Sequence, residues 1–268
     1  YLQLRFVSTS TFALLYTSGS ILQASGDTIT PMKAQFLSRA ILIPLSPVLI
    51  FIVGLGLPGA AVATSIGQIV GVAMTLRVLF SGKSRVKITL AGLRPDFPLY
   101  GRMVKLGAPS SWTTGERALA QLLLTGVVAP FGDTVLAAFG MTQRLQQFVM
   151  LGQMGVGQAA GVLVGQNLGA KKLARARATT WWALGQCFLM SGIVGGLIFL
   201  FPDKFLALFT HEEHLLEVAV PWMHIMVIGF MAFAAGNVFM QVFNTAGDTT
   251  TTMLTGIATI WLVQQPLA

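Results

Sequence analysis

The sequence has 268 residues, of which 54% are apolar and only 10% are charged, and its mean hydropathy is +0.74. A soluble domain carries about 25% charged residues, so this composition excludes a water-soluble enzyme. It also excludes a disordered chain, because disordered segments are poor in apolar residues. The composition is that of a polytopic membrane protein, and the class expected is an all-α bundle of membrane-spanning helices.

Eight apolar segments follow one another along the chain, each with the roughly 20 residues that a spanning helix needs. Turn residues such as Gly26-Asp27, Gly132-Asp133, Pro202-Asp203 and Gly247-Asp248 separate several of them. The first and last segments are incomplete, so we expect a fragment. No basic region precedes the first segment, so no signal peptide is visible. The expected spans are residues 1–24, 31–54, 57–80, 106–131, 134–165, 176–201, 218–243 and 251–268.

Basic residues are concentrated in alternate connections, as the positive-inside rule requires of cytoplasmic loops. In the opposite connections the only basic residue is Lys204, and several acidic residues lie between positions 203 and 217. The net charge of +8 therefore indicates orientation in a membrane and not nucleic-acid binding. The basic residues on the predicted cytoplasmic side are Lys33, Lys83, Arg85, Lys87, Arg94, Arg102, Lys105, Lys171, Lys172, Arg175 and Arg177.

The long basic connection after the third span predicts a boundary between two helical bundles. It contains Pro95 and Pro98 and no run that is apolar enough to cross a membrane. We expect a first lobe at residues 1–82, a cytoplasmic linker at 83–99, and a second lobe at 100–268. Cys187 is the only cysteine, which excludes a disulfide framework and a cysteine metal cluster.

A shift of 221 residues aligns the first span with the seventh without a gap. Residues 21–32 then fall on residues 242–253, and Gly26-Asp27-Thr28 falls on Gly247-Asp248-Thr249. The shift crosses six spans, which is an even number, so both copies run in the same direction through the membrane. The repeat is parallel, and two pseudo-symmetric lobes of six helices predict about twelve helices in all, of which eight are visible.

Four blocks of the sequence form a recognisable set: residues 22–28 with Pro31, the second copy at 247–249, residues 105–109 with Glu116 in the span that follows, and residues 161–170 before a basic stretch. Together these blocks resemble the multidrug and toxic compound extrusion (MATE) family. The resemblance covers nearly the whole chain. It implies a cation-coupled exporter of cationic or amphipathic compounds, with twelve helices in two lobes.

Glu116 lies about ten residues into the fourth span, hence roughly 15 Å deep in the bilayer. A deep ionisable group is costly, so it is a functional candidate: it can exchange a proton, bind sodium or attract a cationic drug. Arg117 is either its structural partner or part of the same site. Thr113, Arg117 and Gln121 share a polar stripe that Glu116 borders, and this stripe should face a cavity or the bundle interior.

Asn237 and Gln241 form a polar face on the seventh span together with Asn244. They are candidates for substrate or cation binding, although hydrogen bonding between helices explains them equally well. The family resemblance implies an acid in this helix, and none occurs between Glu217 and Asp248. A coupling acid in the missing first helix is therefore an open alternative.

Glycines at positions 157, 161, 165 and 169 form a four-residue ladder on the fifth span, which predicts close helix packing. We expect Gly26 and Gly247 to end helices, and Asp27 and Asp248 to cap the helices that follow. The sequence has no Walker A motif and no H-E-x-x-H zinc motif. No metal site, enzyme cofactor, nucleic acid or protein partner is therefore expected.

The function expected from these features is multidrug efflux by proton or sodium antiport, with alternating access between the two lobes. The protein would be a multi-pass transporter of the cell (inner) membrane and not an enzyme. Two alternatives remain open at this point: a lipid-linked oligosaccharide flippase of similar lobed architecture, which should have a larger and more basic cavity, and a membrane-embedded lipid enzyme. The identity of the substrate, the coupling ion and the oligomeric state do not follow from the sequence.

Overall fold

The computed structural model describes residues 2–82, 84, 86–88, 96–207, 209–210 and 212–267. Within these residues the chain is helical and contains no strand. It forms two compact units, residues 1–95 and 96–268. The first unit contains α1 (Leu2–Ala24), α2 (Ile29–Pro47) with a π-helical extension η1 (Val48–Ile52), and α3 (Leu57–Ser81).

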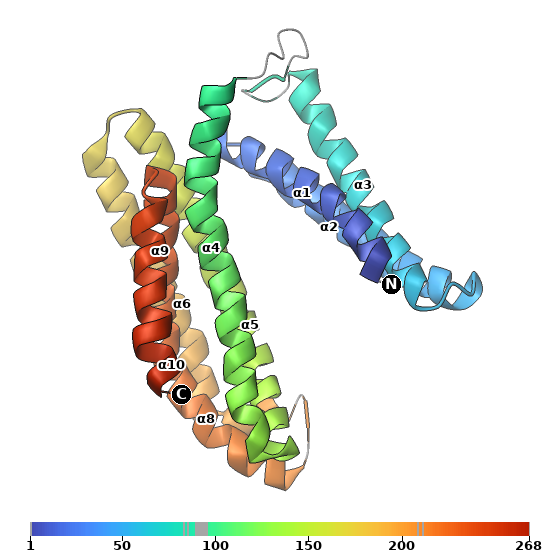
Figure 1. The fold of residues 1–268 in the computed structure, drawn as a ribbon, viewed down its shortest axis with the longest axis vertical. Helices are drawn as coiled ribbons and strands as arrows, with labels where there is room; N and C mark the ends of the chain where they lie inside the picture. Colours follow the sequence, from blue (N-terminus) through green and yellow to red (C-terminus); the bar gives the residue numbers. More distant parts are fainter. Residues whose placement is uncertain are drawn as a thin grey trace. The chain divides into compact units, whose positions relative to one another are not determined.

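The second unit contains five long helices, which Figure 1 shows running roughly along one another. They are α4 (Phe97–Val128) with a 3₁₀ turn η2 (Ala129–Phe131), α5 (Asp133–Gly169), α6 (Leu173–Leu200), α8 (Glu213–Ala246) and α9 (Thr249–Ile257). The last continues as a π-helix, η3 (Ala258–Gln264), and a short α10 (Gln265–Leu267). The short α7 (Pro202–Leu206) lies between α6 and α8. The order matches the eight predicted segments.

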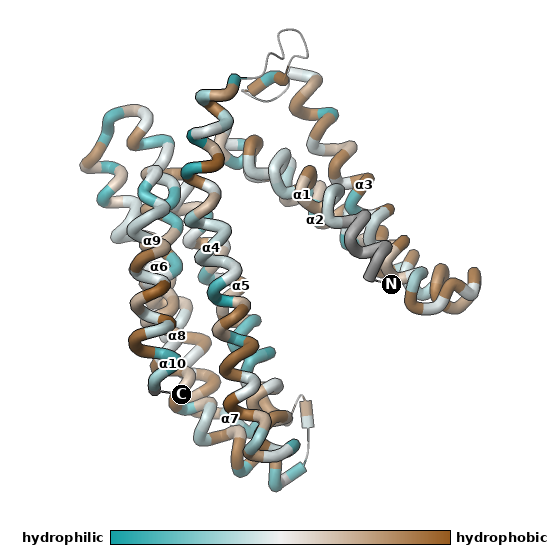
Figure 2. The backbone as a smooth tube through the Cα atoms, in the orientation of Figure 1, coloured by the Kyte–Doolittle hydropathy of each residue, from teal (hydrophilic) through white to brown (hydrophobic). Residues whose placement is uncertain are grey.

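Five helices are long and apolar enough to cross a membrane: Ile29–Ile52, Leu57–Ser81, Asp133–Gly169, Leu173–Leu200 and His214–Ala246. The helices at the other three predicted spans do not meet this criterion among the described residues. In α4 the reason is polar content, since α4 carries Glu116 and Arg117. The α-helical part of α9 has only nine residues and is rich in threonine. Large apolar side chains are exposed along the helices, for example Phe36 at 76% and Phe51 at 80%. Figure 2 shows hydrophobic residues distributed along the helices.

The fourth helix begins earlier than expected. The sequence interpretation placed its span at 106–131 and a linker at 83–99, whereas α4 begins at Phe97. The Asp96 carboxylate accepts a hydrogen bond from the backbone N–H of Leu99 at 3.0 Å, and Pro98 lies in the first turn. Both features favour a helix start. Residues 83, 85 and 89–95 of the expected linker lie outside the described residues.

Small residues bring the helices of the first unit into close contact around α3. A Cβ on Gly67 would lie 2.6 Å from the carbonyl oxygen of Ser38 in α2, and one on Gly71 would lie 3.1 Å from Leu15 in α1. The hydroxyls of Ser18 and Thr75 are 2.8 Å apart. Within a membrane such close contacts and interhelical hydrogen bonds take the place of the hydrophobic effect.

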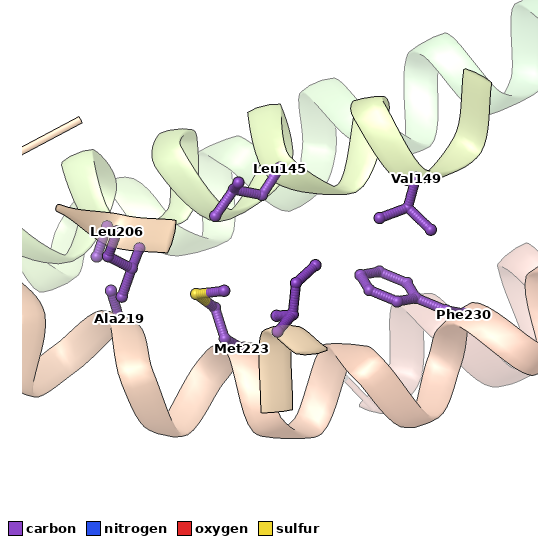
Figure 3. Close-up of a cluster of buried hydrophobic side chains, with 8 residues drawn as sticks. Leu145, Val149, Leu206, Ala219, Met223 and Phe230 are labelled. Atoms are coloured by element: carbon purple, nitrogen blue, oxygen red, sulfur yellow. The ribbon is translucent and has the colours of Figure 1, made fainter. Parts of the chain in front are cut away.

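The core of the second unit lies between α5, α6 and α8. Figure 3 shows one end of it, where Leu145 and Val149 of α5 face Met223 and Phe230 of α8. Leu206 of α7 closes this end. A second buried cluster continues along the same three helices and comprises Ala160, Ala183, Leu184, Cys187, Ala234 and Val238.

The two copies of the sequence repeat form the same turn. The N–H groups of Gly26 and Asp27 donate to the carbonyl oxygens of Gln23 and Leu22 at 2.9 and 3.0 Å. In the second copy, the N–H groups of Gly247 and Asp248 donate to the carbonyl oxygens of the equivalent residues, Asn244 and Phe243, at 3.2 and 2.9 Å. Both glycines have a left-handed backbone, with φ of 97° and 87°. This is the Schellman arrangement, which satisfies the last carbonyl groups of a helix.

The helix that follows each turn is capped by the repeated aspartate. Asp27 accepts from the backbone N–H of Thr30 at 3.0 Å and from its hydroxyl at 2.6 Å. Asp248 accepts from the N–H of Thr251 at 3.1 Å. The hydrogen bonds from Thr30 hold the pKa of Asp27 below its ordinary value. The repeat is therefore visible in hydrogen bonding as well as in sequence.

Candidate functional site

Glu116 lies in the middle of α4 and faces α9. Its side chain is 5% exposed, and Thr113 and Ala120, one turn to either side, are 4% and 3% exposed. The opposing residue on α9 is Gly256, where a Cβ would lie 3.6 Å from the Thr113 methyl carbon and 3.7 Å from Glu116 Oε2. These are ordinary van der Waals distances, so Gly256 marks the point where α9 packs against the carboxyl group.

Neither carboxylate oxygen of Glu116 has a hydrogen-bond partner in the described part of the protein. A buried ionised carboxylate without partners is strongly unfavourable. Both carboxylate oxygens are therefore available to a ligand. This property makes Glu116 the strongest functional candidate.

Arg117 follows Glu116 in the sequence and interacts with it electrostatically, but its side chain contacts a different helix. Its Nη2 points toward α8 and lies 3.2 Å from the sulfur of Met240. Among the described residues no ion pair joins it to Glu116. Neighbouring residues on a helix point about 100° apart, so each contacts a different helix.

The rest of the predicted polar stripe on α4 divides between two surfaces. Thr113 is buried beside Glu116, and its hydroxyl donates to the carbonyl oxygen of Pro109 at 3.0 Å. Its oxygen lone pairs remain as acceptors. Gln121 and Arg117 are exposed within the second unit. The structure therefore brings Thr113 and Glu116 together and leaves Arg117 and Gln121 on the adjacent face.

Asn237 and Gln241 of α8 face α5 and not Glu116. Asn237 is 3% exposed, and its Nδ2 donates to the backbone oxygen of Gln153 at 2.9 Å. A Cβ on Gly157 would lie 2.6 Å from Asn237 Nδ2 and 3.4 Å from the Gln241 side chain. In the structure both residues belong to the contact between α5 and α8.

The glycine ladder of α5 lies against this polar face of α8. A Cβ on Gly161 would lie 2.9 Å from the Thr245 hydroxyl, and one on Gly165 would lie 2.5 Å from the Thr245 methyl group. Gly169 has no neighbour within 4 Å of such a Cβ. Three of the four glycines thus allow close packing of α5 on α8, and the fourth lies beyond the contact.

The sequence interpretation missed the importance of Gln153. This side chain is fully buried, and its Nε2 lies 2.6 Å from the Ser191 hydroxyl of α6 and 3.3 Å from the Phe230 carbonyl oxygen of α8. It therefore joins three helices. Gln153 lies four residues before Gly157, so it continues the ladder register, and that spacing was the available signal.

Gly256 and the π-helix η3 were also missed. The π-helix begins at Ala258, two residues after Gly256, and at its far end Gln265 Nε2 donates to the carbonyl oxygen of Ala120 at 3.3 Å. Short π-helical segments often occur at functional sites. No hydropathy pattern predicts them, because they depend on how the helix packs.

Groups of three or more His, Cys, Asp and Glu side chains that could hold a metal ion do not occur among the described residues. Glu116 is the buried carboxyl among the described residues, and the Thr113 hydroxyl beside it offers a neutral oxygen.

The sequence model of the protein family described as MatE matches residues 117–268, which is more than half of the chain. The chain belongs to the MATE family. The predicted family is thereby confirmed, as is the all-helical membrane fold. MATE proteins are transporters and not enzymes, and several apolar helices place this one in the cell membrane as a multi-pass protein.

Two curated relatives align with the entire MATE chain. The probable multidrug resistance protein YoeA of Bacillus subtilis is 24% identical over 275 residues, covering 100% of this chain and 59% of the relative. The probable multidrug resistance protein NorM of Thermotoga maritima is 23% identical over 276 residues, covering 100% and 58%. The chain therefore spans less than two thirds of the length of these relatives.

Solved structures of MATE proteins have the same fold. A MATE structure in complex with MaL6 superposes with a TM-score of 0.91 at 21% identity, covering 98% of this chain and 60% of that one. A MOP superfamily transporter from Pyrococcus furiosus gives a TM-score of 0.83 at 22% identity, with coverage of 89% and 54%. At this level of identity the comparison shows the fold, and residue roles must come from this chain itself.

Proposed function

We propose that the complete protein exports small cationic or amphipathic compounds in exchange for a cation, H⁺ or Na⁺, that binds at Glu116. The observation that carries this proposal is the buried Glu116 carboxyl, which has no hydrogen-bond partner among the described residues. The names of the relatives, which are multidrug resistance and export proteins, support the class of substrate.

Coupling follows from the free energy of the unpaired carboxyl group. When the cation is bound, the neutral site is compatible with the dry contact between α4 and α9. When the cation leaves, the negative charge favours water or a cationic compound, so the helices separate. If the cation favours the conformation in which α4 and α9 are in contact and the drug favours the one in which they are apart, the two ligands are exchanged across the membrane. A ligand that binds both conformations equally well does not shift the equilibrium between them.

The neighbouring residues have separate roles in this proposal. Thr113 lies beside the carboxyl and contributes a hydroxyl oxygen to a bound cation. Arg117 and Gln121, exposed on the adjacent face of α4, contact the transported compound. Asn237 and Gln241 maintain the packing of α8 on α5. Alternating access between the two lobes completes the proposed cycle.

The test uses the full-length protein in proteoliposomes with an imposed pH or sodium gradient and a fluorescent cationic substrate. Glu116→Gln keeps the size of the side chain and removes its charge, so we expect at least about a tenfold loss of gradient-driven transport. Glu217→Gln is the matched control, because Glu217 is 79% exposed and lies 3.9 Å from His214.

The outcomes of this experiment are distinct. Loss of transport in Glu116→Gln only, with normal transport in Glu217→Gln, supports the proposal. A comparison of the two gradients identifies the coupling ion. Unchanged transport by Glu116→Gln would place cation coupling elsewhere, and absence of drug transport by the parent protein under either gradient would contradict export.

A further inference from the structure

The turn between α5 and α6 leads into a surface that combines four cations and two tryptophans. Within the second unit all six side chains are exposed, with Trp181 at 66% and Trp182 at 75%. We call it the basic–aromatic surface. It consists of Lys171, Lys172, Arg175, Arg177, Trp181 and Trp182.

The spacing on α6 places cations and tryptophans in line along the helix. Arg175 and Trp182 are seven residues apart, and Arg177 and Trp181 are four apart, so each pair shares one face. The opposite face of α6 packs into the core through Ala176, Ala183 and Cys187. The basic–aromatic surface therefore points away from α5 and α8.

The described part of the chain contains this turn at three places, and of these three only the turn between α5 and α6 carries positive charge. Lys171 and Lys172 donate to the carbonyl oxygens of Leu168 and Asn167 at 2.9 and 2.8 Å. The Gly26-Asp27 and Gly247-Asp248 turns make the equivalent pair of bonds. Two lysines thus occupy the positions of a glycine and an aspartate.

Lys171 occupies a backbone conformation that favours glycine. Its φ is +58°, which makes it the only described residue other than glycine with a positive φ. A side chain in this left-handed region is strained. Lys172 stands at the N-cap of α6 without a side-chain capping bond. Neither lysine is a residue that the turn itself favours, so the charge has a separate use.

No carboxylate lies within ion-pair distance of these four cations among the described residues. Basic residues beside a spanning helix attract the phosphate groups of anionic lipids, whereas tryptophan favours the boundary between headgroups and acyl chains. Trp181 and Trp182 lie about 14 Å along the helix from Lys172. That distance exceeds a headgroup layer of about 6 Å, so it reaches the upper acyl chains.

We propose that the basic–aromatic surface binds anionic phospholipid of the cytoplasmic leaflet. The cations at the turn contact the headgroup phosphate, and the two tryptophans contact the upper acyl chains. This binding is independent of the antiport mechanism proposed above. It requires neither Glu116 nor a transported compound.

The experiment uses the full-length protein in vesicles of phosphatidylcholine with phosphatidylglycerol as the anionic lipid. Either lipid is brominated on its acyl chains, so that it quenches nearby tryptophan fluorescence. The fluorescence of Trp181 and Trp182 is the difference between the signals of the parent protein and of the Trp181→Phe/Trp182→Phe variant. We expect brominated phosphatidylglycerol to quench this fluorescence to the degree that corresponds to a local lipid fraction about threefold or more above its fraction in the bilayer.

Charge variants then test the assignment. Lys172→Gln combined with Arg175→Gln should reduce the enrichment by at least about threefold, whereas Lys204→Gln should not. Lys204 lies in a predicted external connection, with its ammonium 4.9 Å from the Phe201 ring centre. Equal quenching by both brominated lipids, or enrichment that persists without the basic side chains, would overturn the proposal.

Lys171→Gly separates lipid binding from folding. Glycine removes the strain at φ +58°, so the thermal midpoint should rise by roughly 2 °C. The enrichment of phosphatidylglycerol should fall in the same variant. A purely structural role for Lys171 predicts no fall in enrichment, and that result would exclude the lysine from the lipid site.

Discussion

The second unit buries polar groups in two places that differ in how those groups are satisfied. Between α5, α6 and α8, the amide nitrogens of Gln153 and Asn237 donate to Ser191 and to backbone oxygens of neighbouring helices, whereas their amide oxygens have no partner among the described residues. Between α4 and α9, the Glu116 carboxyl has no hydrogen-bond partner among the described residues. Both sites are almost completely buried, so burial alone does not distinguish them.

This difference teaches which buried polar residues hold the fold together. A polar side chain that joins several helices stabilises their packing, and its loss lowers the free energy of unfolding. A charged group without partners destabilises the fold. It is retained where the protein gains something other than stability. The two sites therefore predict opposite responses to substitution.

The largest effect is expected where α5 packs closely on α8. Gly157→Leu places a side chain against Asn237, and we expect it to lower the free energy of unfolding by about 3 kcal/mol. Gly155→Leu, on the same helix with nothing within 4 Å of its Cβ position, should change it by less than about 0.5 kcal/mol. Thermal unfolding in detergent measures both. Equal destabilisation by the two would mean that α5 and α8 are not in close contact.

Removal of the buried amide of Gln153 should produce the next largest effect. Gln153→Leu loses the bonds to Ser191 and to the Phe230 carbonyl, and should cost about 1–2 kcal/mol of stability. Transport should be reduced only in proportion to the amount of folded protein. If the purified variant were normally stable but unable to transport, Gln153 would belong to the transport site.

Glu116→Gln should leave the thermal midpoint at neutral pH unchanged or raise it, because a neutral amide replaces an unpaired acid. We expect the free energy of unfolding of the variant to lie within about 0.5 kcal/mol of that of the parent protein, or to be higher. Thermal unfolding in detergent at neutral pH measures it. A loss of stability similar to that of Gln153→Leu would show that the carboxyl has a structural partner in the full-length protein, and the contrast between the two sites would fail.

The capping aspartates give a smaller effect, on the start of single helices. Asp248→Ala removes the hydrogen bond to the Thr251 N–H at the start of α9 and should cost about 1 kcal/mol. Asp248→Asn keeps an acceptor and should cost less. Thermal unfolding of both variants tests this. A cost for the asparagine equal to that of the alanine would mean that the cap acts through charge and not through its hydrogen bond.

Asp27 should give the smallest effect, and that effect should depend on pH. Because the pKa of Asp27 is lowered in the folded protein, its contribution is fully present above the unfolded value of about 3.9 and is lost as the pH falls below it. The difference in thermal midpoint between the parent protein and Asp27→Asn should therefore shrink as the pH falls below about 4 and vanish only below the lowered pKa of the folded protein. A difference that grows on acidification would contradict the direction of the pKa shift.

Much of this fold follows from local sequence patterns. Apolar runs and the turns between them place the helices, because these signals lie within a few residues of one another. The start of α4 shows how a local signal can be overlooked. Asp96 and Pro98 mark a helix start at Phe97, but the weak hydropathy of the stretch suggested a linker.

The environment of each polar side chain could not be predicted in the same way. Asn237 and Glu116 both lie on otherwise apolar helices, and the sequence does not show which helix each one faces. That depends on packing across the unit, such as the small Gly256 opposite Glu116 and the backbone of Gln153 opposite Asn237. The depth of Glu116 follows from counting residues, whereas its lack of a partner appears only in the folded structure.

The contact between α5 and α8 has a mechanical consequence. These helices have 37 and 34 residues, hence lengths of roughly 50 Å or more, and the hydrocarbon layer is about 30 Å thick. Glycines at positions 157, 161 and 165 allow close contact at three successive turns, which opposes sliding of one helix past the other. We therefore expect the two helices to move together, so that a displacement at one aqueous surface is accompanied by a displacement at the other.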